Sequence, residues 1–127
     1  MLDMNVNFDF MTISSYGNST ESTGEVKIKK DLDNSINGRH VLIVEDIVDS
    51  GLTLKNLKEV LSTRKPASLK VCCMLDKPSR RKVEMIPDYS CFEIPDKFVI
   101  GYGLDYAEEF RQLKDVCYID SEYAKTL

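Results

Sequence analysis

The sequence has little of what several specialised classes of protein need. It contains no tryptophan, one histidine and four cysteines. The cysteines form no C-x-x-C pair, and only His40 could add an imidazole to them, which excludes a zinc site of the usual kind. We therefore expect the cysteines to be reduced and mostly buried; they are Cys72, Cys73, Cys91 and Cys117.

Long apolar runs and an excess of positive charge are also missing. No stretch approaches the roughly 18 to 20 apolar residues of a membrane span, and no basic segment followed by an apolar core opens the chain, so we expect a cytoplasmic protein without a membrane partner. A net charge of −4 and a pI of about 5.0 argue against a nucleic-acid binder. A small anionic substrate fits, if backbone N–H groups, a metal ion and a few cations hold it.

What remains is the composition of an ordinary globular domain. Of the 127 residues, 43% are hydrophobic and 30% charged, which predicts one domain over residues 1–127. Strand-like and helix-like patterns alternate along the chain, which predicts an α/β fold. The expected strands are Val6–Ser14, Val41–Val44, Leu69–Leu75, Tyr89–Ile94 and Phe98–Gly101, and the expected helices are Leu52–Leu61 and Ala107–Leu113.

The continuous apolar run Val41–Val44 is typical of a strand buried on both faces of a parallel sheet. Glu45 and Asp46 follow it and are expected to end the strand. Because ligands of open parallel sheets bind beyond the carboxyl ends of the strands, this acidic pair lies where a site is expected. The two carboxylates could accept hydrogen bonds from vicinal sugar hydroxyls or hold a hydrated Mg²⁺.

The next residues, 49–53, have the chemistry of a monophosphate cradle. They supply a glycine, two hydroxyls and the N–H groups of a helix start; they are Asp49, Ser50, Gly51, Leu52 and Thr53. The segment is not a G-x-x-x-x-G-K-[ST] loop, and no G-x-G-x-x-G follows a strand. The simpler alternative is that Asp49 or Ser50 caps the helix and the acidic pair only solvates a strand end.

Four segments together resemble the hypoxanthine-guanine branch of the type I phosphoribosyltransferases. They are SSYGNST at 14–20, VLIVEDIVDSGLT at 41–53, LDKP at 75–78 and PDKFVIGYGLDY at 95–106. The resemblance implies a mostly parallel, Rossmann-like sheet flanked by helices. It also implies purine salvage with Mg²⁺, in which phosphoribosyl pyrophosphate and hypoxanthine or guanine give IMP or GMP and pyrophosphate, and assembly as a dimer or tetramer.

The same resemblance assigns roles around the ribose and phosphate. Asp49 matches the family's general base, which receives the proton of purine N7 as N9 attacks the ribose C1 carbon. Glu45 and Asp46 match its ribose and metal ligands, and residues 49–53 its 5′-phosphate loop. The polar loop from Ser15 to Lys29, with Ser15 and Tyr16 as contact residues, would close over the centre and exclude water. A surface hairpin is the alternative for this loop.

Further residues match the family's purine and pyrophosphate contacts. Lys77 would donate to purine O6, Phe98 would stack on the base and the Val99 backbone would contact its edge. Asp105 would lie at the purine and bind Mg²⁺, and Arg111 would stabilise the leaving pyrophosphate. The alternatives are a solvated surface lysine, core packing of Phe98, and a surface ion pair.

The family normally carries roughly fifty residues before Val6, including a strand and helix that this chain lacks, and loss of that strand would leave backbone groups without partners. The second hypothesis is therefore a catalytically impaired fragment, or a binding-only regulatory module for phosphoribosyl pyrophosphate or a nucleotide.

Overall fold

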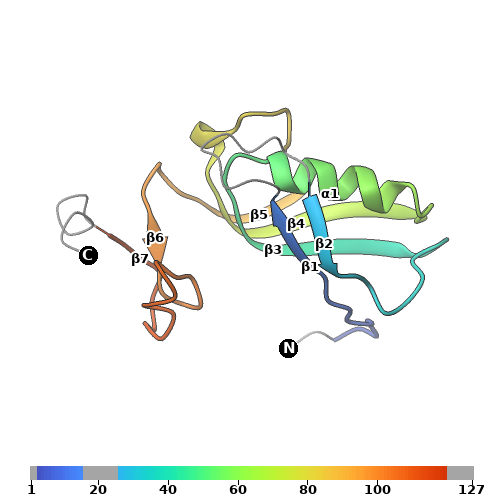
Figure 1. Ribbon diagram of the computed structural model, residues 1–127, viewed down its shortest axis with the longest axis horizontal. Helices are drawn as coiled ribbons and strands as arrows, with labels where there is room; N and C mark the ends of the chain where they lie inside the picture. The colour runs from blue at the N-terminus through green and yellow to red at the C-terminus, as the bar shows by residue number, and fades with distance from the viewer. Residues whose placement is uncertain (1–2, 16–25, 120–127) are drawn as a thin grey trace.

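A three-stranded parallel sheet forms the centre of the chain in the computed structural model, which describes residues 3–15 and 26–119 (Figure 1). Its strands are β3 (His40–Val48), β4 (Ser68–Asp76) and β5 (Tyr89–Glu93), in the order β3-β4-β5. His40 lies opposite Ser68 at the start of the sheet. A parallel sheet linked through a helix confirms the α/β prediction.

Helix α1 (Leu52–Ser62) connects β3 to β4 and lies over one face of the sheet (Figure 1). Its apolar residues repeat at helical spacing, so that Leu54, Leu57 and Leu61 are buried together. They share one core with Val71 and Cys73 of β4, both of which have no exposed surface. The predicted amphipathic helix is confirmed.

The other face of the sheet is open in the described part of the chain. Along β3 the side chains alternate between half-buried and exposed, and Leu42 and Val44 are 52% and 72% exposed. The prediction that this strand is buried on both faces was wrong. A continuous apolar run fits two covered faces, whereas α1 covers only one of them here.

Strand β3 also continues through the acidic pair. Glu45, Ile47 and Val48 are opposite Cys73, Leu75 and Asp76, so the pairing with β4 extends to the end of both strands. The expectation that Glu45 and Asp46 end the strand was wrong, because backbone pairing with β4 holds charged residues in the extended conformation as well as apolar ones. The predictions for β4 and β5 agree with the structure to within a residue or two.

The predicted first strand is much shorter than expected. Only β1 (Thr12–Ser15) pairs, antiparallel with β2 (Val26–Lys30). Upstream of it the chain is held by Asp9, whose carboxylate accepts hydrogen bonds from the backbone N–H groups of Asp33 and Asn34 at about 3.0 Å. The bond from Asp33, more than any other interaction, lowers the pKa of Asp9. These contacts with a turn replace the strand pairing that the alternating pattern of residues 6–11 predicted.

The C-terminal part of the described chain forms a small hairpin, β6 (Val99–Ile100) with β7 (Cys117–Tyr118), at the end of the molecule beyond the sheet (Figure 1). A 3-10 turn, η1 (Pro78–Arg80), follows β4. The predicted helix from Ala107 to Leu113 is absent, and that prediction was wrong. Left-handed φ angles of 51°, 69° and 73° at Ala107, Glu108 and Phe110 are incompatible with a helix.

The cysteines are free, but only partly as expected in burial. Cys73 is buried, and burial raises the pKa of its thiol to about 11. Cys91 and Cys117 are exposed, so the prediction of mostly buried cysteines was wrong. They lie on the edge strand β5 and on the hairpin strand β7. Within residues 3–15 and 26–119, the helices are too short and too polar to cross a membrane.

Candidate functional site

A tight loop, Asp49-Ser50-Gly51, joins the carboxyl end of β3 to the start of α1. Gly51 is the N-cap residue and has a left-handed backbone, with φ of 79°. A Cβ atom at this position would lie 2.9 Å from Cδ of Arg81 and 3.0 Å from Cβ of Met85. The loop therefore needs glycine both for its conformation and for the close approach of these side chains.

The loop lines a hollow of about 280 Å³ together with Glu45, Thr53 and Ile13. The first N–H groups of any α-helix have no partner within the helix and carry the positive end of its dipole. Here no side chain of the loop caps them except Ser50, whose Oγ accepts from Leu52 N at 3.4 Å. This combination suits an anionic group of the size of a phosphate.

The two adjacent carboxylates lie on opposite sides of β3. Glu45 is half-buried and lines the hollow, and burial raises its pKa, with a smaller contribution from the charge of Asp46. Asp46 is exposed, and its Oδ1 accepts from the N–H of Ile47 at 2.6 Å. The structure therefore brings Glu45, and not Asp46, to the loop.

A consequence for stability can be measured at position 45. Because its folded-state pKa is raised, the Glu45 carboxyl stabilises the fold fully only below its ordinary pKa of 4.5, and that contribution is lost as pH rises. Glu45→Gln should therefore be more stable than the parent at pH 7, with a smaller difference at pH 4. Thermal denaturation at both pH values checks this, and equal melting temperatures at pH 7 would contradict it.

Asp49 points its carboxylate toward Arg80. Its Oδ1 accepts from Arg80 Nε at 3.2 Å, and its side chain is 44% exposed. It makes no capping bond to α1; of the two residues in the helix-cap alternative, only Ser50 accepts from an N–H at the helix start, that of Leu52. A carboxylate that lines the hollow and is open to solvent is accessible to a ligand proton.

Lys77 lies at the end of β4, next to the loop. Its backbone N–H donates to Val48 O at 2.9 Å, and the residue is only 5% exposed. It is the one buried polar or charged residue in the part of the chain that the structure describes. A lysine that is buried as a residue does not fit the alternative of a solvated surface lysine.

The remaining predicted residues lie on and after β6. Phe98 is 53% exposed, and its ring forms a T-shaped pair with that of Tyr106 at a centroid distance of 5.4 Å and an interplanar angle of 85°. It is therefore exposed and not a core residue. Val99 pairs with Tyr118 in the hairpin.

Asp105 and Arg111 form an ion pair. Arg111 Nη2 lies 3.1 Å from Asp105 Oδ1, and Arg111 Nη1 donates to Gly103 O at 2.8 Å. The other carboxylate oxygen of Asp105 accepts from Glu108 N at 3.0 Å. Both side chains thus form the surface ion pair that was the alternative for them. Ser15 ends β1, but its side chain and Tyr16 lie outside the described residues, as does most of the predicted lid.

Two arginines that the sequence analysis did not assign, Arg80 and Arg81, contact the loop. Arg80 contacts Asp49 and lies 3.7 Å from Asp96, and Arg81 donates to the backbone of the loop. The only signal in the sequence is the run of three positive charges, Arg80-Arg81-Lys82. This run does not indicate which carbonyl or carboxylate each side chain contacts.

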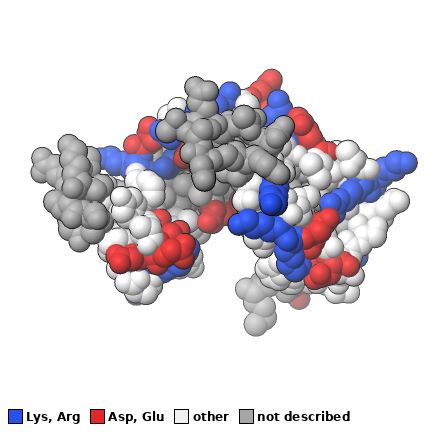
Figure 2. All heavy atoms as spheres, in the orientation of Figure 1, with Lys and Arg blue, Asp and Glu red and all other residues white. Residues whose placement is uncertain are grey.

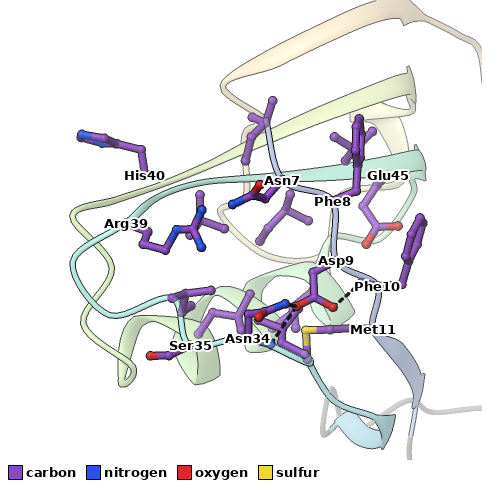
Figure 3. Close-up of a pocket in the computed structure, with 18 residues that line it drawn as sticks. Asn7, Phe8, Asp9, Phe10, Met11, Asn34, Ser35, Arg39, His40 and Glu45 are labelled. Carbon is purple, nitrogen blue, oxygen red and sulfur yellow. Dashed lines mark hydrogen bonds between the residues drawn. The ribbon is translucent and has the colours of Figure 1, made fainter. Parts of the chain in front are cut away.

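A second hollow, of about 330 Å³, runs along the outer edge of β3 (Figure 3). It is lined by the segment Asn7–Met11 and by Arg39, His40 and Glu45, among others (Figure 3). Glu45 is the only residue that it shares with the loop hollow. None of the loop residues 49–53 lines it, so it lies beside the predicted chemistry and is not its centre.

The family model for the phosphoribosyl transferase domain matches residues 2–107. This chain belongs to the phosphoribosyl transferase family. The match includes the loop 49–53, Lys77 and Phe98, so the hollow at the start of α1 lies in the family's own domain.

Relatives narrow the branch of the family. The chain is 58% identical over 112 residues to the hypoxanthine-guanine phosphoribosyltransferase of Bacillus subtilis (strain 168), covering 88% of this chain and 62% of that protein. It is 57% identical over 105 residues to the hypoxanthine phosphoribosyltransferase of Escherichia coli (strain K12), covering 83% and 59%. The crystal structure of a hypoxanthine phosphoribosyltransferase from Staphylococcus aureus aligns with a TM-score of 0.90 at 49% identity, covering 94% and 65%.

The chain thus spans about 62% of the length of the B. subtilis relative. In the described residues no three His, Cys, Asp or Glu side chains gather into a metal site. Mg²⁺ does not require such a cluster, because it commonly keeps several waters and binds through one or two carboxylates and substrate phosphates.

Proposed function

We propose that this chain transfers the phosphoribosyl group of phosphoribosyl pyrophosphate to hypoxanthine or guanine. The bond from the ribose C1 carbon to pyrophosphate breaks, the bond from C1 to purine N9 forms, and the purine loses its N7 proton. The observation that carries the proposal is the loop at 49–51, where a glycine N-cap, a carboxylate and a helix start line one hollow in a phosphoribosyl transferase domain.

The 5′-phosphate of the substrate would lie at the start of α1. There the N–H groups of residues 50–53 and the hydroxyls of Ser50 and Thr53 can donate to its oxygens. The ribose hydroxyls would lie over Glu45, with Asp46 reaching them only if its side chain leaves the Ile47 N–H. Asp49 would accept the N7 proton once the purine displaces Arg80 from its carboxylate.

Mg²⁺ fits the site as a companion of the substrate. Glu45 lines the loop hollow, and a nearby cation would favour the ionised form of its carboxyl, whose pKa is raised by burial. Asp105, which does not line that hollow, is the second carboxylate that the proposal assigns to the metal. When bound, the cation would neutralise charge on the departing pyrophosphate. Asp105 and Arg111 would have to exchange their mutual contact for contacts with metal and pyrophosphate.

Lys77 would select the base. Its ammonium can donate to the O6 acceptor of hypoxanthine or guanine, whereas the 6-amino group of adenine offers it no acceptor there. Phe98 would stack on the base and the Val99 backbone would contact its edge. Whether xanthine is also accepted depends on donors and acceptors around Val99 and Asp105.

Substitution of Lys77 tests this selection. Lys77→Met keeps the length of the side chain and removes the donor, so kcat/KM for hypoxanthine should fall about 10- to 100-fold, while the low activity on adenine should change little. Initial rates with the two bases give the ratio. Parent activity on adenine equal to that on hypoxanthine would contradict the assignment.

The direct test of the proposed function is nucleotide formation. The purified chain is incubated with phosphoribosyl pyrophosphate, Mg²⁺ and hypoxanthine, guanine or adenine, and the products are separated by chromatography. We expect IMP and GMP but not AMP. Tight binding of IMP without turnover would instead support the second hypothesis, a binding-only module or a catalytically impaired fragment, which needs only the loop and not Lys77 or Phe98.

The same proposal extends to the domain organisation, location and assembly of the chain. We infer one domain over residues 1–127, acting in the cytoplasm as a dimer or tetramer. The exposed apolar side chains Leu42, Val44 and Phe92 supply surface that association could cover. On the face in Figure 2, lysines and arginines lie among aspartates and glutamates. With a net charge of −4, we propose small-molecule substrates and no nucleic-acid partner.

A further inference from the structure

Arg81 lies directly behind the loop that joins β3 to α1. Its side chain is 14% exposed. Nη1 donates to the carbonyl oxygens of Val48 at 3.2 Å and Asp49 at 2.7 Å, and Nη2 donates to the carboxylate of Asp76. One guanidinium therefore connects the carboxyl ends of two neighbouring strands and the first residue of the loop.

Residues 77–82, which include Arg81, also hold the end of β3 and the loop through backbone hydrogen bonds. Lys82 N donates to Ser50 O at 2.9 Å, and Lys77 N donates to Val48 O at 2.9 Å. The stem of Arg81 also fills the space beside Gly51, as the 2.9 Å approach of a Cβ at that position to Arg81 Cδ indicates. Three successive carbonyls, those of Val48, Asp49 and Ser50, thus face residues 77–82.

This arrangement fixes the direction of the loop's N–H groups. In a planar trans peptide the C=O and the following N–H point in opposite directions. If the carbonyls of residues 48–50 point toward the 77–82 segment, the N–H groups of Asp49, Ser50 and Gly51 point away from it. Successive N–H groups aimed to one side form a concave anion site.

We propose that Arg81 is a positioning residue for the phosphate group of the ligand: it holds the loop carbonyls on one side, so that the loop N–H groups face the phosphate. The inference rests on the proposed function and deepens it. Arg81 itself does not contact the phosphate, because its three acceptors are Val48, Asp49 and Asp76.

The rival interpretation is that Arg81 only stabilises the fold through its ion pair with Asp76. The two interpretations predict different changes in the affinity for ligands with and without a phosphate. A loop with misdirected N–H groups loses affinity for IMP and phosphoribosyl pyrophosphate but keeps that for inosine. A general loss of folded protein lowers the binding stoichiometry for every ligand and leaves the dissociation constants unchanged.

The experiment is calorimetric titration of the full chain with phosphoribosyl pyrophosphate and Mg²⁺, IMP and inosine. The variants are Arg81→Met, which keeps the stem, and Arg81→Lys, which keeps the charge but cannot span three acceptors. Lys82→Met is the matched control, since Lys82 is exposed and contributes its backbone N–H. We expect the dissociation constants of both phosphorylated ligands to rise about tenfold or more in both Arg81 variants, with inosine unaffected.

The outcomes are distinguishable. Parent-like affinity for IMP in either folded Arg81 variant overturns the positioning role, as does an equal loss for inosine and IMP. If Arg81→Met does not fold, Arg81→Lys decides between the same results. A parent chain that binds none of the phosphorylated ligands would contradict the proposed function itself, and this inference with it.

Discussion

Replacing Asp49 by asparagine is expected to lower kcat for IMP formation by about 10²- to 10⁴-fold, the usual contribution of a general base. Asparagine has nearly the same shape but cannot accept the purine N7 proton. The structure shows that Asp49 makes no cap bond to α1, so the fold should not depend on its charge. Binding of phosphoribosyl pyrophosphate, which uses the loop N–H groups, should be mostly retained.

Steady-state rates and calorimetry on the same preparations separate the two effects. Asp115→Asn serves as the control, because Asp115 is an exposed aspartate outside the loop. Arg80 loses its partner at 3.2 Å in the Asp49 variant but keeps its contact with Asp96 at 3.7 Å. Turnover unchanged by Asp49→Asn would remove the general-base assignment.

Replacing Gly51 by alanine should destabilise the chain by about 2–3 kcal/mol and weaken phosphate binding as well. The residue has φ of 79°, and the new Cβ would lie 2.9 Å from Arg81 Cδ and 3.0 Å from Met85 Cβ. Relief of these contacts requires Arg81 or Met85 to shift, and Arg81 holds the loop. Urea denaturation followed by titration with IMP measures both losses.

Gly38 offers a matched control for this substitution. It has a similar left-handed φ of 70°, but a Cβ there would meet no atom within 4 Å. Gly38→Ala should therefore cost only the backbone strain, about 1 kcal/mol, and leave ligand binding unchanged. Equal losses in the two variants would mean that the crowding behind the loop contributes nothing.

The central strand, loop and helix could be predicted because they follow local chemistry. The apolar run before Glu45 predicts a strand, the leucine spacing after Gly51 predicts a helix, and both were found. Lys77 and Phe98 were assigned from resemblance. The alternatives were a solvated surface lysine and a core phenylalanine, whereas Lys77 is buried and Phe98 is exposed.

The failures have a common physical cause, which is that tertiary context overrides a local pattern. The segment 107–113 carries a helix-like spacing, but Arg111 donates to Gly103 O and pairs with Asp105, which accompanies a series of turns. Residues 6–11 alternate like a strand, yet Asp9 binds the backbone of a distant turn. Contacts of this range cannot be read from spacing.

The roles of Arg80 and Arg81 were unpredictable for a similar reason. Adjacent arginines after a strand are usually solvated, and nothing in the sequence separates an exposed one from one that is 14% exposed. Their contacts depend on where β3 and β4 end relative to each other. The strand register, which pairs Val48 with Asp76, sets this.

Amide NMR of the labelled chain during titration with phosphoribosyl pyrophosphate and Mg²⁺ tests most directly whether the loop at the start of α1 binds the ligand. We expect the largest chemical-shift changes at the N–H groups of Ser50, Gly51 and Thr53, with smaller ones at Glu45 and Lys77. The largest changes along the outer edge of β3, at Asn7 to Met11 and Arg39, would place the ligand in the other hollow and contradict the central claim that the loop at the start of α1 binds it.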